Sequence, residues 1–494
     1  MFRNSRFYKG LWSRWTALRF GEVEYDSDSA SGIILQSELV LVQGLKECSS
    51  CGLFQAVPDL RPGQVAECKR CGSMLERVRR TSPIMAPLAF CLASIALYLA
   101  LLVSPLMTID VYGRENTVTI RSGPHELVDQ GFGLIAILVN LATILMPAVV
   151  LGFMLFILYG ASSHKAPSLV RDVLAWYEKL RPWSMIEVYV IGLIVAYTKL
   201  VDLAVVKLLP GSFILFALMI TMAAMDSTFN SELFWHKFPP SDREPPRLYE
   251  KDFRTEDYIV SELPRNQLLS CMYCQSVFLA DHPVPNGADM GNCPVCDQTL
   301  RRRKQRSAMA AASYLLAASV FYIPANLLPI MTYVKMGQGQ PSTILSGVKQ
   351  LWHANLYVLA LIVLFASITF PVLKIVALST MLCCEALRKD WNLRFLSRLY
   401  GFVCFIGRWS MIDVFMISIL AAIVRFSFFA HVSADSGVVF FASVVVLTIF
   451  AADVYDPRGM WDAAGYNCTL TQSEKNSPDK VLVMRGKQVE SERT

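Results

Sequence analysis

Two copies of one cysteine module divide this chain, and each copy stands just ahead of a long apolar segment. Each copy has two Cys-x-x-Cys pairs, separated by sixteen residues in the first copy and eighteen in the second: Cys48, Cys51, Cys68, Cys71, Cys271, Cys274, Cys293 and Cys296. Two such pairs supply the four thiolates of a tetrahedral Zn²⁺ site. The chain is therefore predicted to contain two copies of a unit in which a metal-clamped β-ribbon leads into a membrane bundle.

The expected metal is structural zinc, because four thiolates leave no coordination position open for chemistry. Rubredoxin-like iron and a thiol redox switch remain alternatives, since both use the same ligands. His282 lies between the two pairs of the second copy and is surplus to a complete ligand set. Basic runs follow both copies, but they flank membrane segments and are explained by topology, so nucleic acid is not an expected partner.

The composition indicates a membrane protein that crosses the bilayer several times. Of 494 residues, 54% are hydrophobic and 17% are charged, whereas a soluble domain carries about 25% charge. Apolar runs of about 18 residues or more are long enough to span a bilayer as helices. Eight spans are expected, near residues 84–103, 132–159, 184–205, 212–229, 308–330, 355–383, 409–430 and 437–455.

The orientation follows from the lysines and arginines near the span ends. One set of ends carries most of them: Arg77, Arg79, Arg80, Lys165, Arg171, Lys179, Arg181, Arg301, Arg302, Arg303, Lys304, Arg306, Arg388, Lys389, Arg394, Arg398 and Arg408. The opposite ends carry only Arg114, Arg121, Lys207, Lys335 and Lys349. Both ribbons and both termini are therefore expected to face the cytoplasm.

The expected organisation is all-α in the membrane, with two tandem four-helix modules and a small β-ribbon before each. The N-terminal extension is basic and aromatic, and either lies on the inner leaflet or forms a disordered tail. The predicted parts are an extension and linker 1–43, ribbon one 44–80, module one 84–229, a linker 230–264, ribbon two 265–306, module two 308–456 and a tail 457–494.

The two halves repeat more than their cysteines. Pro-x-Met-Thr occurs at Pro105 and again at Pro329, and Trp-Ser-Met-Ile-(Glu/Asp)-Val begins at Trp183 and at Trp409. Because each half has four spans, the repeats share one orientation, unlike the inverted repeats of many secondary transporters.

These paired motifs, with the ribbons and the segment Asp456-Pro-Arg458, resemble the paraquat-inducible protein A family, the PqiA/LetA-type inner-membrane proteins of Gram-negative bacteria. The resemblance covers residues 45–463. It implies an inner-membrane location, a periplasmic MCE-domain partner with a tunnel, and a role in phospholipid traffic between membranes. The first half departs from the pattern, with Asn230-Ser-Glu232 at the place of Asp456-Pro-Arg458, so the halves need not be equal in function.

Two charged residues fall deep inside predicted spans of the second half. A charge at mid-depth costs about 2.5–3.5 kcal/mol on insertion scales, so it usually meets a partner or water and marks a pathway. Lys374 follows Pro371 within span six, and Asp413 lies one turn into span seven. Both lie in the cytoplasmic half of the membrane, and we expect them to pair. The first half has Glu187 at the Asp413 position but Val150 at the Lys374 position.

Further polar candidates for the path lie closer to the span ends. Lys199 and Arg425 are placed to meet a lipid phosphate near the outer leaflet, and Asp202 lies a turn beyond Lys199. Asn326 follows the helix break at Pro324. For Glu187, Lys199 and Arg425 the alternative is a side chain that snorkels to the interface, and for Pro324 it is an ordinary kink.

The motifs that mark common enzymes are missing: there is no Walker A loop, GxSxG or HExxH, and the chain has six histidines. The protein is not expected to be an enzyme. The favoured function is the inner-membrane subunit of a lipid-transport system that passes phospholipid to an MCE-protein tunnel. The alternatives are a membrane redox or stress sensor that uses the ribbon thiols, and a passive anchor for the MCE partner.

Overall fold

The computed structural model describes residues 39–79, 81–111, 114–162, 169–201, 205–238, 246–249, 267–285, 289–335, 338–353, 355, 357–423 and 430–466. Three of the residues predicted to line a path therefore cannot be placed. Asp202 and Arg425 lie outside these ranges, as does the side chain of Lys199. The N-terminal extension up to residue 38 and the tail from residue 467 also lie outside the described residues.

The first ribbon consists of two antiparallel hairpins, β2–β3 and β4–β5. Each hairpin turns through one Cys-x-x-Cys pair, so the loops of both hairpins carry the ligands. A preceding strand, β1, does not join these hairpins. The bounds are β1 Val40–Val42, β2 Leu45–Glu47, β3 Phe54–Ala56, β4 Val65–Glu67 and β5 Met74–Arg77.

The second ribbon repeats the two hairpins as β10–β11 and β12–β13. Strand β1 extends its first hairpin, with Leu41 opposite Phe278 in antiparallel register, and the sheet order is β10-β11-β1-β9. The first strand of the described chain is thus part of the second ribbon's sheet. The bounds are β9 Arg247–Leu248, β10 Leu268–Ser270, β11 Val277–Leu279, β12 Asp289–Asn292 and β13 Thr299–Arg301.

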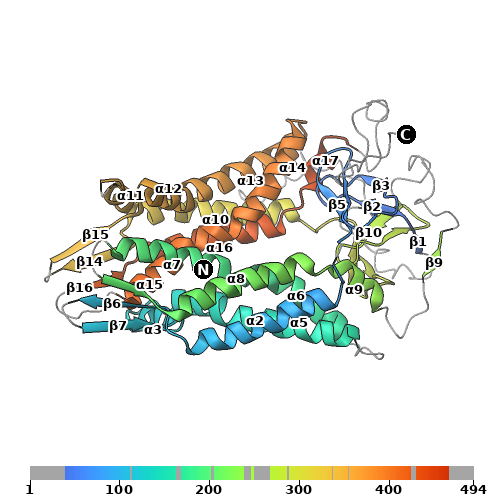
Figure 1. Cartoon of the computed structure of the whole chain (residues 1–494). Coiled ribbons are helices and arrows are strands. Elements are labelled where there is room, and N and C mark those ends of the chain that lie inside the picture. The colour runs from blue at the N-terminus through green and yellow to red at the C-terminus, as the bar shows by residue number, and fades with distance from the viewer. Residues whose placement is uncertain are drawn as a thin grey trace, which may run out of the picture. The chain divides into compact units, whose positions relative to one another are not determined.

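Eight helical stretches in the described residues are long and apolar enough to cross a membrane, four in each module. The all-α membrane bundle with two tandem four-span modules, each preceded by a four-cysteine ribbon, is thereby confirmed (Figure 1). In module one the helices are α2 Met85–Val103, α4 Gly133–Asn140, α5 Met146–Ser162, α6 Leu169–Leu180, α7 Ile186–Val201, α8 Pro210–Thr228 and the short α9 Ser231–Lys237. In module two they are α10 Ser307–Leu327, α12 Tyr357–Leu364, α13 Phe370–Leu387, α14 Leu393–Ile406, α15 Ile412–Ile423, α16 Gly437–Val454 and the short α17 Arg458–Ala463.

The third span of each module is broken near the ribbons. Helices α6 and α14 are amphipathic, and a 3₁₀ turn joins each to the apolar helix that follows, at Arg181–Trp183 and Gly407–Met411. The sequence did not reveal α6 and α14 as parts of these spans, because their charged face interrupts the apolar run.

The second span of each module contains a π-helical turn at corresponding positions, Leu141–Leu145 and Phe365–Thr369. Pro147 and Pro371 each lie two residues after the turn. Because proline lacks an N–H and clashes with the preceding turn, a widened turn accommodates it within a continuous helix. Inside these turns Thr143 and Ser367 each donate a hydroxyl hydrogen bond to a carbonyl one turn earlier, at 2.8 and 2.7 Å.

At the end of the bundle away from the ribbons, each module carries a three-stranded antiparallel sheet and a short helix. The sheet orders are β7-β6-β8 and β15-β14-β16, so the two modules match here as well. The bounds are β6 Met107–Val111, β7 Arg114–Val118, α3 Ser122–Asp129, β8 Val205–Leu208, β14 Met331–Lys335, β15 Gln338–Ser342, α11 Ile344–His353 and β16 Ala430–Ala434.

The modules meet through their third spans, α7 and α15. Tyr189 and Phe415 pack edge to face with ring centroids 5.8 Å apart, and a Cβ on Gly192 would lie 3.2 Å from Phe415. Hydrogen bonds also cross between the modules: Asn116 Nδ2 donates to the carbonyl of Ala422 at 3.2 Å, and the Ala434 amide donates to Gln130 Oε1 at 2.8 Å.

Candidate metal centres and buried charges of the membrane bundle

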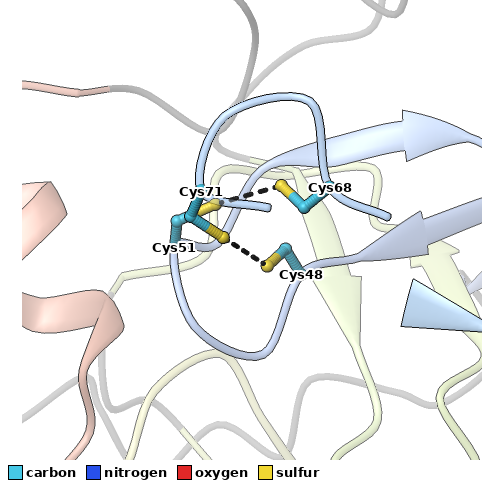
Figure 2. Close-up of side chains that lie close together, drawn as sticks. All are labelled: Cys48, Cys51, Cys68 and Cys71. Atoms are coloured by element: carbon cyan, nitrogen blue, oxygen red, sulfur yellow. Dashed lines mark hydrogen bonds between the residues drawn. The ribbon is translucent and has the colours of Figure 1, made fainter. Parts of the chain in front are cut away.

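The four cysteines of the first ribbon converge on one point. The sulfur atoms of Cys48 and Cys71 lie 3.5 Å apart, and those of Cys51 and Cys68 lie 3.6 Å apart (Figure 2). All four side chains are buried. Sulfur atoms around a tetrahedral Zn²⁺ with bonds of about 2.3 Å stand about 3.8 Å apart, so the cluster has the size that the ion requires.

The second ribbon repeats this geometry with its own four cysteines. Cys271 and Cys296 bring their sulfur atoms to 3.5 Å, and Cys274 and Cys293 bring theirs to 3.7 Å. The sulfur atoms of each ribbon all lie within 4.8 Å of one another. Both predicted four-cysteine sets are thus brought together, and each could hold one metal ion.

The backbone of each knuckle supports this arrangement. The residue after the second cysteine of every pair has a positive φ, as at Gly52 and Gly72, and its amide donates to the carbonyl of the first cysteine. Gln275 and Asp297 adopt the same conformation in the second ribbon, at φ 58° and 64°. A left-handed residue is uncommon outside glycine, so its recurrence shows that knuckle geometry is maintained in both ribbons.

Crowding and burial of the thiols move their pKa values apart: the pKa values of Cys51 and Cys48 are raised in the first cluster, and those of Cys293 and Cys296 in the second. The sulfur of Cys68 accepts hydrogen bonds from Cys48, Cys51 and Cys71, and these hold the pKa of the Cys68 thiol well below its usual range. The pKa of Cys271 is lowered in the same way by its three partners. Metals bind thiolates rather than thiols, so each cluster has at least one sulfur that is ionised readily and could begin metal binding.

Changing one ligand in either ribbon is expected to remove one metal ion per chain. Cys68→Ser leaves three sulfur ligands in the first ribbon and does not alter the second. The check is elemental analysis of the purified protein, with Cys404→Ser, an exposed cysteine outside both ribbons, as the control. A metal content that Cys68→Ser leaves equal to the control would contradict the assignment.

A buried network of charges joins the first ribbon to the end of module two. The Arg303 guanidinium donates to Glu47 and Asp462, both at 2.8 Å, and Arg458 donates to Glu47 at 3.2 Å and to Asp456 at 2.9 Å. The side chain of Glu47 is 3% exposed, and those of Arg303 and Arg458 are 7% and 8% exposed. We call these five residues the charge network.

The pKa of Asp456 is lowered within this network. Burial by itself raises the pKa of this carboxyl, but the hydrogen bonds and charge of Arg458, with the charge of Arg303, outweigh burial. A carboxylate whose folded pKa lies below its unfolded value of about 3.9 stabilises the fold above that pH. That contribution is lost as pH falls through the folded pKa.

The stability difference between the wild type and Asp456→Asn is therefore expected to depend on pH. It is constant near neutral pH and shrinks as pH falls below about 4, because protonation then removes the same charge that the substitution removes. Denaturant unfolding in detergent across this range measures it. A difference that stays constant down to the lowest pH would show that Asp456 does not titrate with a lowered pKa.

Within the membrane spans, Lys374 is almost fully buried. It lies on α13, its side chain is 1% exposed, and its ammonium donates to the Ser410 hydroxyl at 2.8 Å and the Gly407 carbonyl at 3.1 Å. Both acceptors belong to the 3₁₀ turn between α14 and α15. The break in the helix leaves the Gly407 carbonyl available to a side chain.

The expected ion pair between Lys374 and Asp413 does not form in the described part of the chain. Asp413 is 4% exposed and lies one turn beyond Ser410, on α15, and the lysine reaches only as far as the 3₁₀ turn. Both residues could be placed within spans from the sequence, but the rotation of their helices could not be predicted from it.

The remaining predicted path residues are placed as follows. Asn326 donates to the Tyr322 carbonyl of its own helix at 2.9 Å, so it does not bridge to a second span. Glu187 lies half-buried in the first turn of α7. Lys199, Asp202 and Arg425 remain outside what the structure describes of side chains.

The comparison with known proteins divides the chain into the same two modules. The sequence profile of the family described as Paraquat-inducible protein A matches residues 84–239 and 309–465, which together make up more than half of the chain. The chain belongs to the paraquat-inducible protein A family. The two matched regions begin at the first span of each module and end after α9 and α17, so this family member contains the family's membrane module twice.

Curated relatives of this family member carry transport names. Intermembrane transport protein PqiA of Escherichia coli K12 is 31% identical over 84% of the chain and 95% of its own length. Lipophilic envelope-spanning tunnel protein A of the same strain is 29% identical over 85% of the chain and 91% of its length. A probable intermembrane transport protein of Haemophilus influenzae is 26% identical over 84% and 95%. No solved structure matches the chain.

The two modules of this family member differ at the Lys374 site. In module one Val150 takes the place of the lysine and is 1% exposed. Ser184, which corresponds to Ser410, has a buried hydroxyl without a hydrogen-bond partner. Module one instead places Arg181 at the break in its third span, where it donates to Asp226 of α8 at 2.9 Å.

Sequence reasoning missed Ser410, Gly407 and Arg181 as contributors to these polar sites. The signal that could have found Ser410 was present, because the serine belongs to the repeated Trp-Ser-Met-Ile motif. The role of the Gly407 carbonyl has no side-chain signature and depends on the helix break.

Proposed function

We propose that this protein is the inner-membrane subunit of a lipid-transport system, which passes phospholipid between the bilayer and the tunnel of a periplasmic MCE-domain protein. The printed names of its relatives, which describe intermembrane transport and an envelope-spanning tunnel, support transport between membranes. In this proposal the ribbons and termini face the cytoplasm, zinc fills both four-cysteine sites, and the β-sheets at the other end of the bundle face the periplasmic partner.

The observation that carries this proposal is the buried ammonium of Lys374. Burying a charge within a span costs about 2.5–3.5 kcal/mol on insertion scales, and here two neutral acceptors compensate for it. A residue that serves only packing would not need the charge, as Val150 shows at the corresponding position of module one. The charge is therefore assigned to transport rather than to stability.

We assign Lys374 to the polar centre of the lipid path, with Asp413 one turn farther along α15. A phosphate headgroup is a stronger partner for an ammonium than a hydroxyl and a carbonyl are. Entry of the headgroup requires the turn Gly407–Met411 to move, and this turn is not part of a continuous α-helix. Lys199, Asp202 and Arg425, with Glu187 and Asn326, are proposed to line the rest of the path.

The test is transfer of labelled phospholipid from proteoliposomes to the purified MCE partner, together with complementation of an envelope-defective strain. Lys374→Met keeps the length of the side chain and removes its charge, and is expected to abolish both activities. Lys389→Met, at an exposed lysine after α13, is the matched control and should retain both. If Lys374→Met transfers lipid normally, the protein is instead a passive anchor for its partner.

The redox-sensor alternative is distinguished by the same assay. If the ribbons sense oxidants, mild oxidation releases their metal and changes activity in parallel with thiol oxidation. A transporter with structural zinc shows no such change until the ribbon unfolds.

A further inference from the structure

We propose that the two ribbons are exchanged between the halves of the chain: each metal-clamped ribbon is the docking partner of the other half's membrane module. The metal of the first ribbon then holds the ribbon end of module two, and the metal of the second ribbon holds that of module one. This inference concerns the assembly of the fold and does not depend on the proposed transport role.

The first ribbon packs on module two. Its cysteines share a buried hydrophobic cluster with residues of α10, α13, α14 and α17, and no helix of module one contributes to that cluster within the described residues. Arg70, which is 1% exposed, lies between the ligands Cys68 and Cys71. Its guanidinium stands 5.8 Å from the ring centre of Trp461 and 5.6 Å from that of Tyr466.

The second ribbon packs on module one. Its cysteines belong to the large cluster that includes Phe229, Phe234 and Trp235, which lie after α8 and in α9. Tyr273, between the ligands Cys271 and Cys274, packs edge to face on Trp235 with centroids 6.1 Å apart. Figure 1 shows the same exchange, with β2 and β5 beside α17 and with β10 beside α9.

The two docking sites are built in the same way. Trp235 and Trp461 are corresponding residues of the repeat, and each receives the third residue of a Cys-x-x-Cys knuckle. Each indole N–H is anchored on the helix that opens the third span of its module: Trp235 donates to Glu178 of α6 at 3.2 Å, and Trp461 donates to Ser397 of α14 at 2.9 Å. Because the corresponding tryptophans of both modules contact a ribbon, the contact is a repeated feature of the fold rather than incidental packing.

The first ribbon also touches module one, through single polar contacts. Lys46 pairs with Glu232 of α9, and Arg79, after the ribbon, donates to the Phe229 carbonyl. These contacts lack a shared hydrophobic cluster. The charge network adds further bonds between the first ribbon and module two, since Glu47 of the first ribbon binds Arg458 of α17.

Metal binding fixes the docking residues because both lie inside a knuckle. With one ligand on either side, Arg70 and Tyr273 can hold one position only while the knuckle is closed. For the first ribbon, the contact extends through Ser397 along α14 to Gly407, where Lys374 is bound. The metal nearest in the sequence to module one therefore controls the end of module two.

The test separates docking from metal loading by substituting the knuckle residues instead of the ligands. Arg70→Ala is compared with Lys69→Ala, its half-buried neighbour in the same knuckle, and Tyr273→Ala with Met272→Ala, its exposed neighbour. Elemental analysis confirms an unchanged metal content. The readouts are maleimide labelling of the buried Cys384 of module two, with the adjacent exposed Cys383 as reference, and hydrogen exchange of α17 and α9.

Arg70→Ala is expected to raise Cys384 labelling and α17 exchange by about fivefold or more, since losing a desolvated cation–π contact eases local opening. Tyr273→Ala is expected to raise exchange in α9 and leave Cys384 protected. The proposal is overturned if Arg70→Ala acts on α9 instead, or if neither variant differs from its control. Should Arg70→Ala fail to fold, Arg70→Lys keeps the charge, and a smaller rise in Cys384 labelling is expected; no rise overturns the proposal.

Discussion

Replacing Glu47 with alanine is expected to lower the free energy of unfolding by about 3–5 kcal/mol, the cost of breaking a buried ion pair by removing one partner. Glu47 neutralises two arginines at once, Arg303 at 2.8 Å and Arg458 at 3.2 Å. Both guanidinium groups stay buried after the substitution and keep only Asp462 and Asp456 as partners, so their desolvation is compensated less. Denaturant unfolding in detergent, followed by far-UV circular dichroism, measures the change.

The matched control is Asp289→Ala, which removes the carboxylate of an exposed pair. Asp289 binds Arg301 at 2.6 Å, but the two side chains are 46% and 37% exposed, and such pairs contribute about 0–1 kcal/mol. The two substitutions remove the same kind of bond at different burial. Equal effects would show that the charge network does not stabilise the fold.

Lys374→Met is expected to have the opposite effect on stability and to raise the free energy of unfolding by about 1–2 kcal/mol. The methionine fills the same space without the penalty of burying an ammonium. Two acceptors lose a donor, but the fold tolerates this, since the corresponding hydroxyl of Ser184 already lacks a partner. Loss of transport together with gain of stability is the mark of a group kept for function.

The same unfolding assay measures this change, with Lys389→Met as the control. The exposed Lys389 bears no desolvation penalty, so its replacement should alter the free energy by less than about 0.5 kcal/mol. A stability loss of several kcal/mol in Lys374→Met would mean that the lysine is a structural tie between α13 and the turn Gly407–Met411.

The two four-cysteine clusters could be predicted from the sequence because their geometry is local. Each Cys-x-x-Cys knuckle is one hairpin turn, and the spacing between Cys51 and Cys68 is what two short hairpins need. The eight spans could also be predicted from the sequence, because a helix of apolar residues satisfies the hydrogen bonds of its own backbone in the bilayer.

The partner of each ribbon could not be predicted in this way. A knuckle residue such as Arg70 looks like any basic residue beside a membrane, and its contact with Trp461 arises only from tertiary packing. Glu47 gave no signal either, because its arginine partners are distant in the sequence. At Lys374, the position of the lysine within a span could be predicted from the sequence, whereas its partners Ser410 and Gly407 depend on the 3₁₀ turn between α14 and α15.

The exchange of ribbons has a consequence for the order in which the chain is made. The second ribbon emerges after α9 and can dock at once. The first ribbon must wait, because Arg458, the partner of its Glu47, lies 411 residues after Glu47 in the chain. At about 5–20 residues per second, the first ribbon waits about 20–80 s for its docking surface. In the proposed exchange, the first ribbon holds its metal during translation with Arg70 and Glu47 uncovered. A nascent chain that loses this metal early exposes its first ribbon to proteases.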